Sequence, residues 1–229
     1  MPELPEVETV KEALNQTVKG QTIKDIELRY EPMVKNMSAD EFKEKLINQT
    51  IQEVSRRGKY LVFHFDDYQL LSHLRMEGKY FYVDSDFELN PHVHAIFTLE
   101  NGKRLLYQDT RKFGTYHLYD KAIDLETTAP FQVLGLEPFA TEFTPSYVKE
   151  KIQNKKKPIK SLLLDQTVVC GLGNIYVDEV LYRARLHPLT SSSELTDKDI
   201  ANVVKYTVEV LARAIELGGT TIRTFRSSH

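Results

Sequence analysis

Short, closely spaced stretches of strand-forming residues between positions 51 and 119 constrain the fold of this chain most. They are rich in β-branched and aromatic residues and are interrupted by glycines, and Asn101-Gly102 is a strong hairpin signal. So many short strands predict an antiparallel β-sandwich or flattened barrel. The predicted strands cover residues 51–54, 60–65, 68–74, 79–83, 94–99, 104–107 and 115–119.

Helical patterns lie on either side of this strand region. Near the N-terminus, Val7, Val10, Leu14 and Val18 recur at helical spacing before Gly20, and a strand (21–30) and a helix (38–47) capped by Ser38, with Glu41 in the capping-box position, follow. Residues 120–144 lack periodicity and are interpreted as a linker, and helices are predicted at 146–153, 158–166, 174–184 and 196–217.

Strands first and helices second predict two lobes in an α+β fold. The first would be an N-terminal helix plus an antiparallel β-sandwich, and the second would be α-helical. The expected domains are residues 1–130 and 131–229.

Composition narrows the class of protein. The 229 residues are 41% hydrophobic and 28% charged, without a run of about 18 apolar residues that could cross a membrane and without a signal peptide. We therefore expect no membrane partner and a cytoplasmic location. The single cysteine, Cys170, excludes internal disulfides and multi-cysteine metal sites, and we interpret it as a small buried hydrophobe. The net charge of −3 does not by itself indicate a nucleic-acid partner.

The first residues, Met1-Pro2-Glu3, carry the clearest chemical signal. Removal of Met1 would leave Pro2 with a free secondary amine, which titrates close enough to neutral pH to act as a nucleophile. Glu3 would place a carboxyl beside it to give or take a proton. The alternative is an ordinary acidic start to a helix, where Glu6 and Glu8 would complement the helix dipole.

Several other motifs allow both a functional and a structural interpretation. Lys59 follows Arg56-Arg57 and Gly58, and this turn could simply be basic and solvated. Strand alternation would place His73 and Arg75 on one face and Met76, a common core gap-filler, on the other. Phe113 before Gly114 could be a strand aromatic beside a bulge.

Two further motifs lie in the helical region. The basic run at 155–160 ends at an expected helix start, where lysines can bind phosphate, although such runs are often only solvated. Gly171-Leu172-Gly173 suggests a dinucleotide-binding turn, but Tyr176 replaces the third glycine and leaves the signal weak.

In the strand region, His92 and His94 flank Val93, but they lack the further ligands that a zinc site needs.

Five sequence segments together resemble the bacterial formamidopyrimidine-DNA glycosylases. They are MPELPEVETV, RRGKY, HLRMEG, DTRKFG and SLLLDQTVVCGLGNIYVDE, and they extend over most of the chain. Leu4 favours this oxidised-purine family over the endonuclease VIII-like enzymes, which usually carry glycine there. The resemblance implies a helix–two-turn–helix lobe and bifunctional glycosylase and AP lyase activity on oxidised purines such as 8-oxoguanine. It also implies duplex DNA as partner, and we expect a monomer.

The resemblance assigns roles to individual residues. Pro2 would be the nucleophile and Glu3 the acid, and Lys59 would bind phosphate and transfer protons. Met76, Arg111 and Phe113 would enter the duplex where the damaged base leaves it, with Arg111 contacting the orphaned cytosine. Further expected DNA contacts are His73, Arg75, His92, Lys156, Lys160 and Asn174.

The resemblance ends near residues 218–225, which look like the start of a loop that closes over the extruded base. Family members continue into a C-terminal zinc finger with four cysteines, so no metal or other cofactor is expected in this chain, which stops at His229. One alternative is therefore a DNA-binding fragment with little or no activity. The other is a nucleotide-cofactor enzyme built on the Gly171–Gly173 turn.

Overall fold

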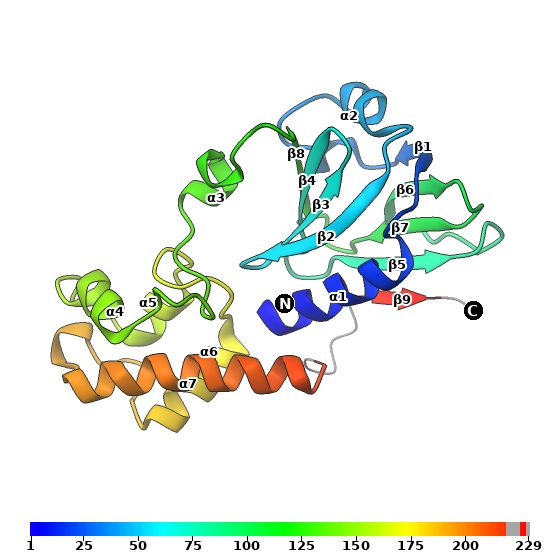
Figure 1. Cartoon of the computed structure of the whole chain (residues 1–229). Helices are drawn as coiled ribbons and strands as arrows, with labels where there is room; N and C mark the ends of the chain where they lie inside the picture. The colour runs from blue at the N-terminus through cyan, green and yellow to red at the C-terminus, as the bar shows by residue number, and fades with distance from the viewer. Residues whose placement is uncertain (219–224, 228–229) are drawn as a thin grey trace. The chain divides into compact units, whose positions relative to one another are not determined.

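The computed structural model describes residues 1–218 and 225–227 and divides into two compact units (Figure 1). The first, here called the β unit, holds Met1–Pro2, Glu6–Leu125 and the C-terminal strand β9 (Phe225–Ser227). The second, the helical unit, holds Glu3–Pro5 and the described residues from Glu126 to Gly218.

Two sheets form the β unit in the described part of the chain, which confirms the predicted sandwich. One has the strand order β1-β6-β7-β5-β9 and the other β2-β3-β4-β8; neighbours are antiparallel, except that β5 and β9 run parallel. The bounds are β1 Ile23–Leu28, β2 Ile51–Arg57, β3 Tyr60–Phe65, β4 Tyr68–His73, β5 Lys79–Val83, β6 Val93–Leu99, β7 Arg104–Gln108 and β8 Thr115–Asp120.

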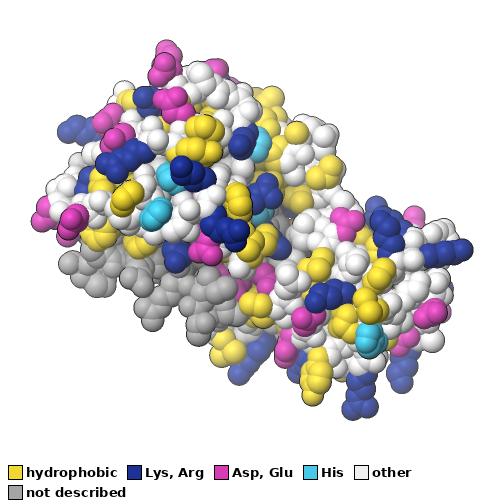
Figure 2. Space-filling view, turned by 180° about the vertical axis from the view of Figure 1, so that it is seen from behind, with side chains coloured by type: hydrophobic (Ala, Val, Ile, Leu, Met, Phe, Trp, Pro, Cys, Tyr) yellow, Lys and Arg dark blue, Asp and Glu magenta, His cyan; other side chains and the backbone are white. Residues whose placement is uncertain are grey.

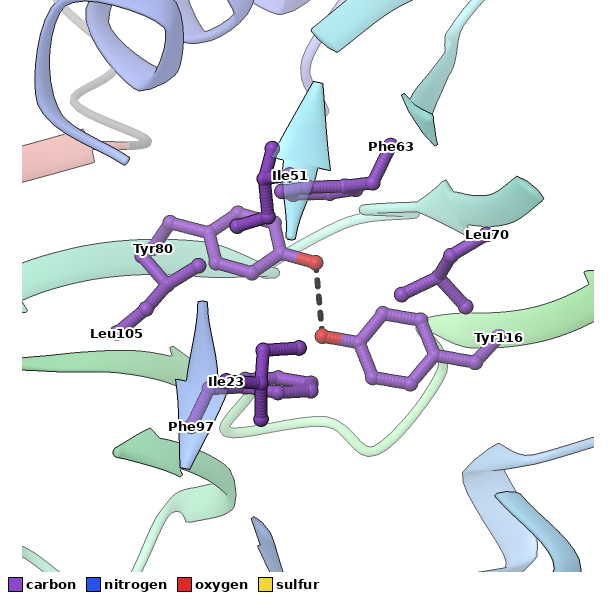
Figure 3. Close-up of a pocket in the computed structure, with 8 residues that line it drawn as sticks. All are labelled: Ile23, Ile51, Phe63, Leu70, Tyr80, Phe97, Leu105 and Tyr116. Carbon is purple, nitrogen blue, oxygen red and sulfur yellow. Dashed lines mark hydrogen bonds between the residues drawn. The ribbon is translucent and has the colours of Figure 1, made fainter. Parts of the chain in front are cut away.

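Tyrosines occupy the centre of this core. Tyr80, Tyr107 and Tyr116 are at most 1% exposed, and their hydroxyls are hydrogen-bonded, as burial demands. Tyr80 Oη lies 2.8 Å from Tyr116 Oη and 2.7 Å from Ser72 Oγ, and Figure 3 shows the two tyrosine hydroxyls facing each other within the apolar lining. Burial raises the pKa of Tyr80, so its hydroxyl stays protonated.

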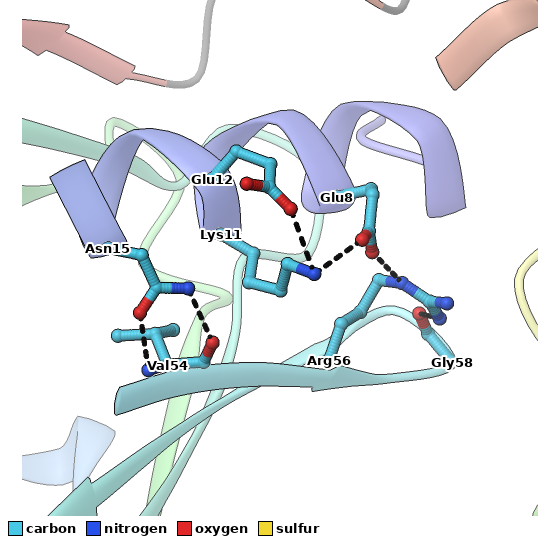
Figure 4. Close-up of polar contacts among 7 residues, drawn as sticks. All are labelled: Glu8, Lys11, Glu12, Asn15, Val54, Arg56 and Gly58. Carbon is cyan, nitrogen blue, oxygen red and sulfur yellow. Dashed lines mark hydrogen bonds and ion pairs between the residues drawn. The ribbon is translucent and has the colours of Figure 1, made fainter. Parts of the chain in front are cut away.

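Helix α1 (Leu4–Thr17) packs its predicted apolar face into the β unit and polar contacts fix it to β2. Asn15 donates to Val54 O and accepts from Val54 N, both at 2.8 Å, and Glu8 Oε2 lies 2.6 Å from Arg56 Nε (Figure 4). Burial opposes ionisation of Glu8, but bonds and charges from Lys11 and Arg56 outweigh it and lower its pKa.

The remaining predicted elements of the β unit are present. Gly20, at φ +85°, follows α1 and adopts the left-handed conformation that favours glycine. After the short turn η1 (Glu31–Met33), α2 (Ala39–Leu46) is capped by Ser38, whose Oγ accepts from Glu41 N at 3.1 Å.

The helical unit contains the four predicted helices. They are α4 Pro145–Ile152, α5 Ile159–Leu164, α6 Asn174–Ala184 and α7 Asp197–Glu216, and η3 (Ser192–Glu194) lies before α7. Thr196 and Asp199 form a complete capping box at the start of α7. The stretch interpreted as a linker also holds η2 (Leu125–Thr127) and the short α3 (Ala129–Gln132), which lack a periodic signal because they are less than two turns long. Among the described residues, no helix is long and apolar enough to cross a membrane.

Replacing Asn15 by alanine should lower the free energy of unfolding by about 1–3 kcal/mol, because both backbone groups of Val54 lose a partner. Chemical denaturation would measure it. The exposed neighbour Gln16→Ala is the control, and equal effects of the two changes would contradict this role for Asn15.

Candidate functional site

Glu3 anchors the N-terminus of α6, 170 positions away in the sequence. Its Oε1 accepts from Gly173 N at 2.5 Å and Tyr176 N at 3.2 Å, and its Oε2 accepts from Ile175 N at 3.0 Å. The side chain is 2% exposed. Backbone N–H groups and the positive end of a helix stabilise a buried negative charge, so the arrangement suits an ionised carboxylate.

The two glycines of the 171–173 turn make room for the N-terminus of the chain. A Cβ on Gly173 would lie 2.6 Å from Glu3 Cγ, and one on Gly171 would lie 2.5 Å from Leu4 Cδ1. The amide of Gly173 binds Glu3 and that of Gly171 binds Gln166 at 2.8 Å. The amides of both glycines are therefore used within the protein.

Pro2 is buried and directly precedes Glu3, while Met1 is 42% exposed. With Met1 in place, the nitrogen of Pro2 belongs to a peptide bond and carries no nucleophilic lone pair. Pro2 therefore becomes an amine only after Met1 is removed.

Lys59 lies in the tight β2–β3 turn. Gly58 adopts φ +59°, and its carbonyl accepts from Arg56 Nη1 at 2.9 Å, which ties the turn to the Glu8–Arg56 pair (Figure 4). Lys59 is only 7% exposed, so the interpretation of the turn as simply solvated is wrong for this side chain.

The segment after β4 departs from the predicted strand alternation. The strand ends at His73, and Arg75 adopts φ +54°, so Arg75 and Met76 both become exposed instead of lying on opposite faces. His73 is 7% exposed, and its Nδ1 accepts from Arg75 N at 3.0 Å. Burial, with the charges of Arg75 and Lys59, lowers the pKa of His73 to about 3. His73 is therefore neutral and carries its proton on Nε2.

Arg111 and Phe113 are exposed on the loop between β7 and β8. The Arg111 guanidinium carbon lies 5.0 Å from the Phe113 ring centroid, and Phe113 is 51% exposed. Phe113 is therefore not a packed strand aromatic. Buried Asp109 accepts hydrogen bonds within this loop, a role not predicted from sequence, although an aspartate opening a loop is a known turn signal.

Basic and histidine side chains gather near one another on the β unit, the left lobe in Figure 2. His92 is exposed, whereas His94 is 4% exposed and its Nε2 lies 2.7 Å from Asp109 O. Positive charge is thus locally concentrated in spite of the net charge of −3.

The helical unit holds the other predicted contact residues. Lys156 is exposed at φ +50°, and Lys160 Nζ pairs with Asp178 Oδ1 at 2.8 Å. Asn174 is exposed at the first position of α6, as predicted. Cys170 is buried as expected, but its thiol also donates to Glu137 Oε2 at 2.8 Å, so it is more than a small hydrophobe.

The cofactor alternatives find no support in these residues. The 171–173 turn follows helix α5 rather than a strand, and Glu3 occupies its helix N-terminus, which contradicts a dinucleotide site. No group of three or more His, Cys, Asp or Glu side chains that could hold a metal ion occurs in the described ranges. One cysteine does not fit the four-cysteine zinc site of the family. The expected base-closing loop, 218–225, lies mostly outside the described residues.

Comparisons with known proteins agree with this fold. A family model of the formamidopyrimidine-DNA glycosylase N-terminal domain matches residues 1–116, and a model of the H2TH domain of the same glycosylase matches 134–226. The formamidopyrimidine-DNA glycosylases of Bacillus licheniformis and Bacillus subtilis are 46% and 47% identical over 229 residues, which is 100% of this chain and 83% of each relative.

Solved structures give the same result. The Lactococcus lactis Fpg in complex with DNA containing an abasic site has a TM-score of 0.90 at 42% identity, covering 96% of this chain and 81% of that one. The wild-type enzyme with N7-benzyl-Fapy-dG DNA scores 0.91 at 42% identity, covering 97% and 82%. Fold and sequence together define a base excision repair DNA glycosylase. The chain belongs to the formamidopyrimidine-DNA glycosylase family.

Replacing Gly173 by alanine should lower the free energy of unfolding by about 1–3 kcal/mol, because the new Cβ would overlap Glu3. Thermal denaturation would test it against Asn174→Ala, an exposed neighbour. Equal melting temperatures would show that Glu3 does not occupy this position.

The free energy of unfolding should depend on pH through the protonation of His73. Between pH 6.5 and about 3 the unfolded chain binds a proton at His73 that the folded chain does not, so stability is lost as pH falls through this window. His73→Gln should make the slope shallower by up to about 1.4 kcal/mol per pH unit in denaturation curves. An unchanged slope, or the same change in the exposed-site control His187→Gln, would contradict a buried neutral histidine.

Proposed function

We propose that this glycosylase removes oxidised purines, 8-oxoguanine and formamidopyrimidines, from duplex DNA and then cleaves the abasic strand through an iminium on Pro2. The anchoring of Glu3 to the α6 amides carries the proposal, because it fixes a carboxylate one residue from the proposed nucleophile. The names of the relatives and the lesions in the solved complexes support this substrate class. We further propose domains 1–130 and 131–229, a cytoplasmic location and a monomer.

In the proposed reaction, Glu3 carries the proton of the Pro2 nitrogen to the sugar. Pro2 attacks the anomeric carbon, the glycosidic bond breaks, and the base leaves with the bonding electrons and takes a proton from solvent water. The proline nitrogen passes its own proton to the ionised Glu3. Glu3 then protonates the ring oxygen as the sugar opens and the iminium forms. The three backbone N–H groups hold the Glu3 carboxylate in place during these transfers.

We propose that the β unit supplies the contacts at the lesion. Lys59 would contact the phosphate and sugar. His73 is neutral, so it would donate a hydrogen bond to a phosphate oxygen without adding a positive charge. Arg111 would face the orphaned cytosine, because its forked donors match the acceptors of that base. Met76 and Phe113 are exposed, which supports a role as apolar wedges. Such wedges offset the free-energy cost of unstacking a base step, about a few kcal/mol.

The remaining proposed contacts are to the DNA backbone. Asn174 is favourable because it is exposed at a helix start, where backbone N–H groups and the helix dipole favour a phosphate. Lys160 would have to exchange its ion pair with Asp178 for a phosphate. The other proposed backbone contacts are Arg75, His92 and Lys156, all exposed.

Borohydride trapping should give a covalent adduct on Pro2 with a duplex that carries 8-oxoguanine opposite cytosine. Peptide mapping would locate the adduct, and intact mass would confirm that Met1 is absent. The matched control is the chain with Met1 retained, which should trap nothing because its Pro2 nitrogen is an amide.

The pattern of adducts separates the alternatives. An adduct only with a pre-formed abasic site would place the defect in base recognition and leave the nucleophile intact. Absence of any adduct once Met1 is gone would contradict an active enzyme and favour the DNA-binding fragment.

A further inference from the structure

Asp109 is a buried carboxylate that organises the loop between β7 and β8. It is 1% exposed and accepts four hydrogen bonds. Oδ1 accepts from Arg111 N and Lys112 N, both at 3.1 Å, and Oδ2 accepts from Gly114 N at 2.8 Å and Tyr107 Oη at 3.0 Å. One side chain therefore binds the backbone on both sides of the exposed loop tip.

The backbone of Asp109 is fixed as well. Asp109 N donates to His92 O at 3.0 Å, and Asp109 O lies 2.7 Å from His94 Nε2. Both histidines lie at the start of β6 or just before it. The carboxylate thus projects from a position that is held on the neighbouring strand.

Tyr107 connects the loop to the tyrosine core. Its ring lies 5.2 Å from that of Tyr80 and 5.7 Å from that of Tyr116. Burial, together with the negative charge of Asp109, raises the pKa of Tyr107, so its hydroxyl remains a donor. A Cβ on Gly114 would lie 1.6 Å from Tyr107 Oη, so only glycine fits where the loop closes.

The loop tip depends on these bonds for its shape. Arg111, Lys112 and Phe113 are all exposed, and Lys112 adopts φ +59°. The Arg111 guanidinium rests on the Phe113 ring, which itself lies on the same tip. The backbone amides bound to Asp109 hold the tip, and Lys112 Nζ also lies 5.2 Å from the centroid of the Tyr30 ring.

We propose that Asp109, assisted by Tyr107, is the positioning residue that sets the selectivity of Arg111 for the base opposite the lesion. The inference rests on the proposed role of Arg111. A pre-organised backbone positions the Arg111 guanidinium before DNA binds. The side chain therefore loses less conformational entropy when it contacts the correct base. Loss of the carboxylate would weaken the preference for cytosine more than it weakens binding to DNA in general.

The test measures the dissociation constants of two duplexes that carry a tetrahydrofuran abasic analogue, one opposite cytosine and the other opposite adenine. Asp109→Asn is nearly isosteric, but it replaces one of the two accepting oxygens with an NH2 group, which only donates, so at least one loop N–H faces a donor. The cytosine preference should fall by about ten-fold. The control is Asp120→Asn. Asp120 is the last residue of β8 and accepts from Ala122 N at 2.9 Å, and its replacement should leave the cytosine preference unchanged.

A double-mutant cycle shows whether Asp109 acts through Arg111. Arg111→Ala alone should bring the preference close to one, and adding Asp109→Asn should change the ratio no further. An unchanged ratio in Asp109→Asn, an additional change in the Arg111→Ala background, or a wild-type chain without preference would overturn the inference.

Tyr107→Phe gives a second measurement if Asp109→Asn does not fold. It removes one of the four bonds and should lower the preference about two- to three-fold. Its control is Tyr82→Phe, which loses a 2.9 Å bond from Asn101 elsewhere in the β unit. Equal ratios in Tyr107→Phe and wild type would overturn the inference. These ratios require no catalysis, so they are independent of the trapping result that tests Pro2.

Discussion

Buried carboxylates that collect backbone N–H groups are the interaction on which both candidate functional regions depend. A charge removed from water is costly unless it is fully hydrogen-bonded, so such a side chain fixes its donors as firmly as they fix it. Glu3 does this at the start of α6, and Asp109 does it between β7 and β8. In each case one acidic side chain accepts hydrogen bonds from several backbone N–H groups of one short segment.

Each carboxylate has a glycine beside it for a steric reason. A Cβ on Gly173 would enter the space of Glu3, and one on Gly114 would enter that of Tyr107 and Asp109. The glycines of the 171–173 turn therefore serve the packing of the chain's own N-terminus. This differs from a phosphate-binding turn, in which glycine brings free amides to a ligand.

Much of the fold could be predicted because local patterns specify it. Alternation and turn residues placed the strands, and Ser38 marked the start of its helix. The prediction was wrong for Arg75 and Met76, since the strand ends at His73 and Arg75 turns to positive φ, which a period-two pattern cannot show. The roles proposed for the candidate site residues come from the family resemblance, because contacts with DNA leave no periodic signal in the sequence.

The sequence by itself determined the order of strands and helices and the family, because these follow from local periodicity and from motifs, and it supplied the residues proposed for the chemistry. Tertiary structure alone decided which groups share a hydrogen-bond network. Glu3 meets Gly173 across 170 positions, and the burial of His73 beside Lys59 and Arg75 sets its neutral state. Such contacts depend on how distant segments pack. The residues around a glutamate or a histidine in the sequence do not specify its hydrogen-bond partner in the folded protein.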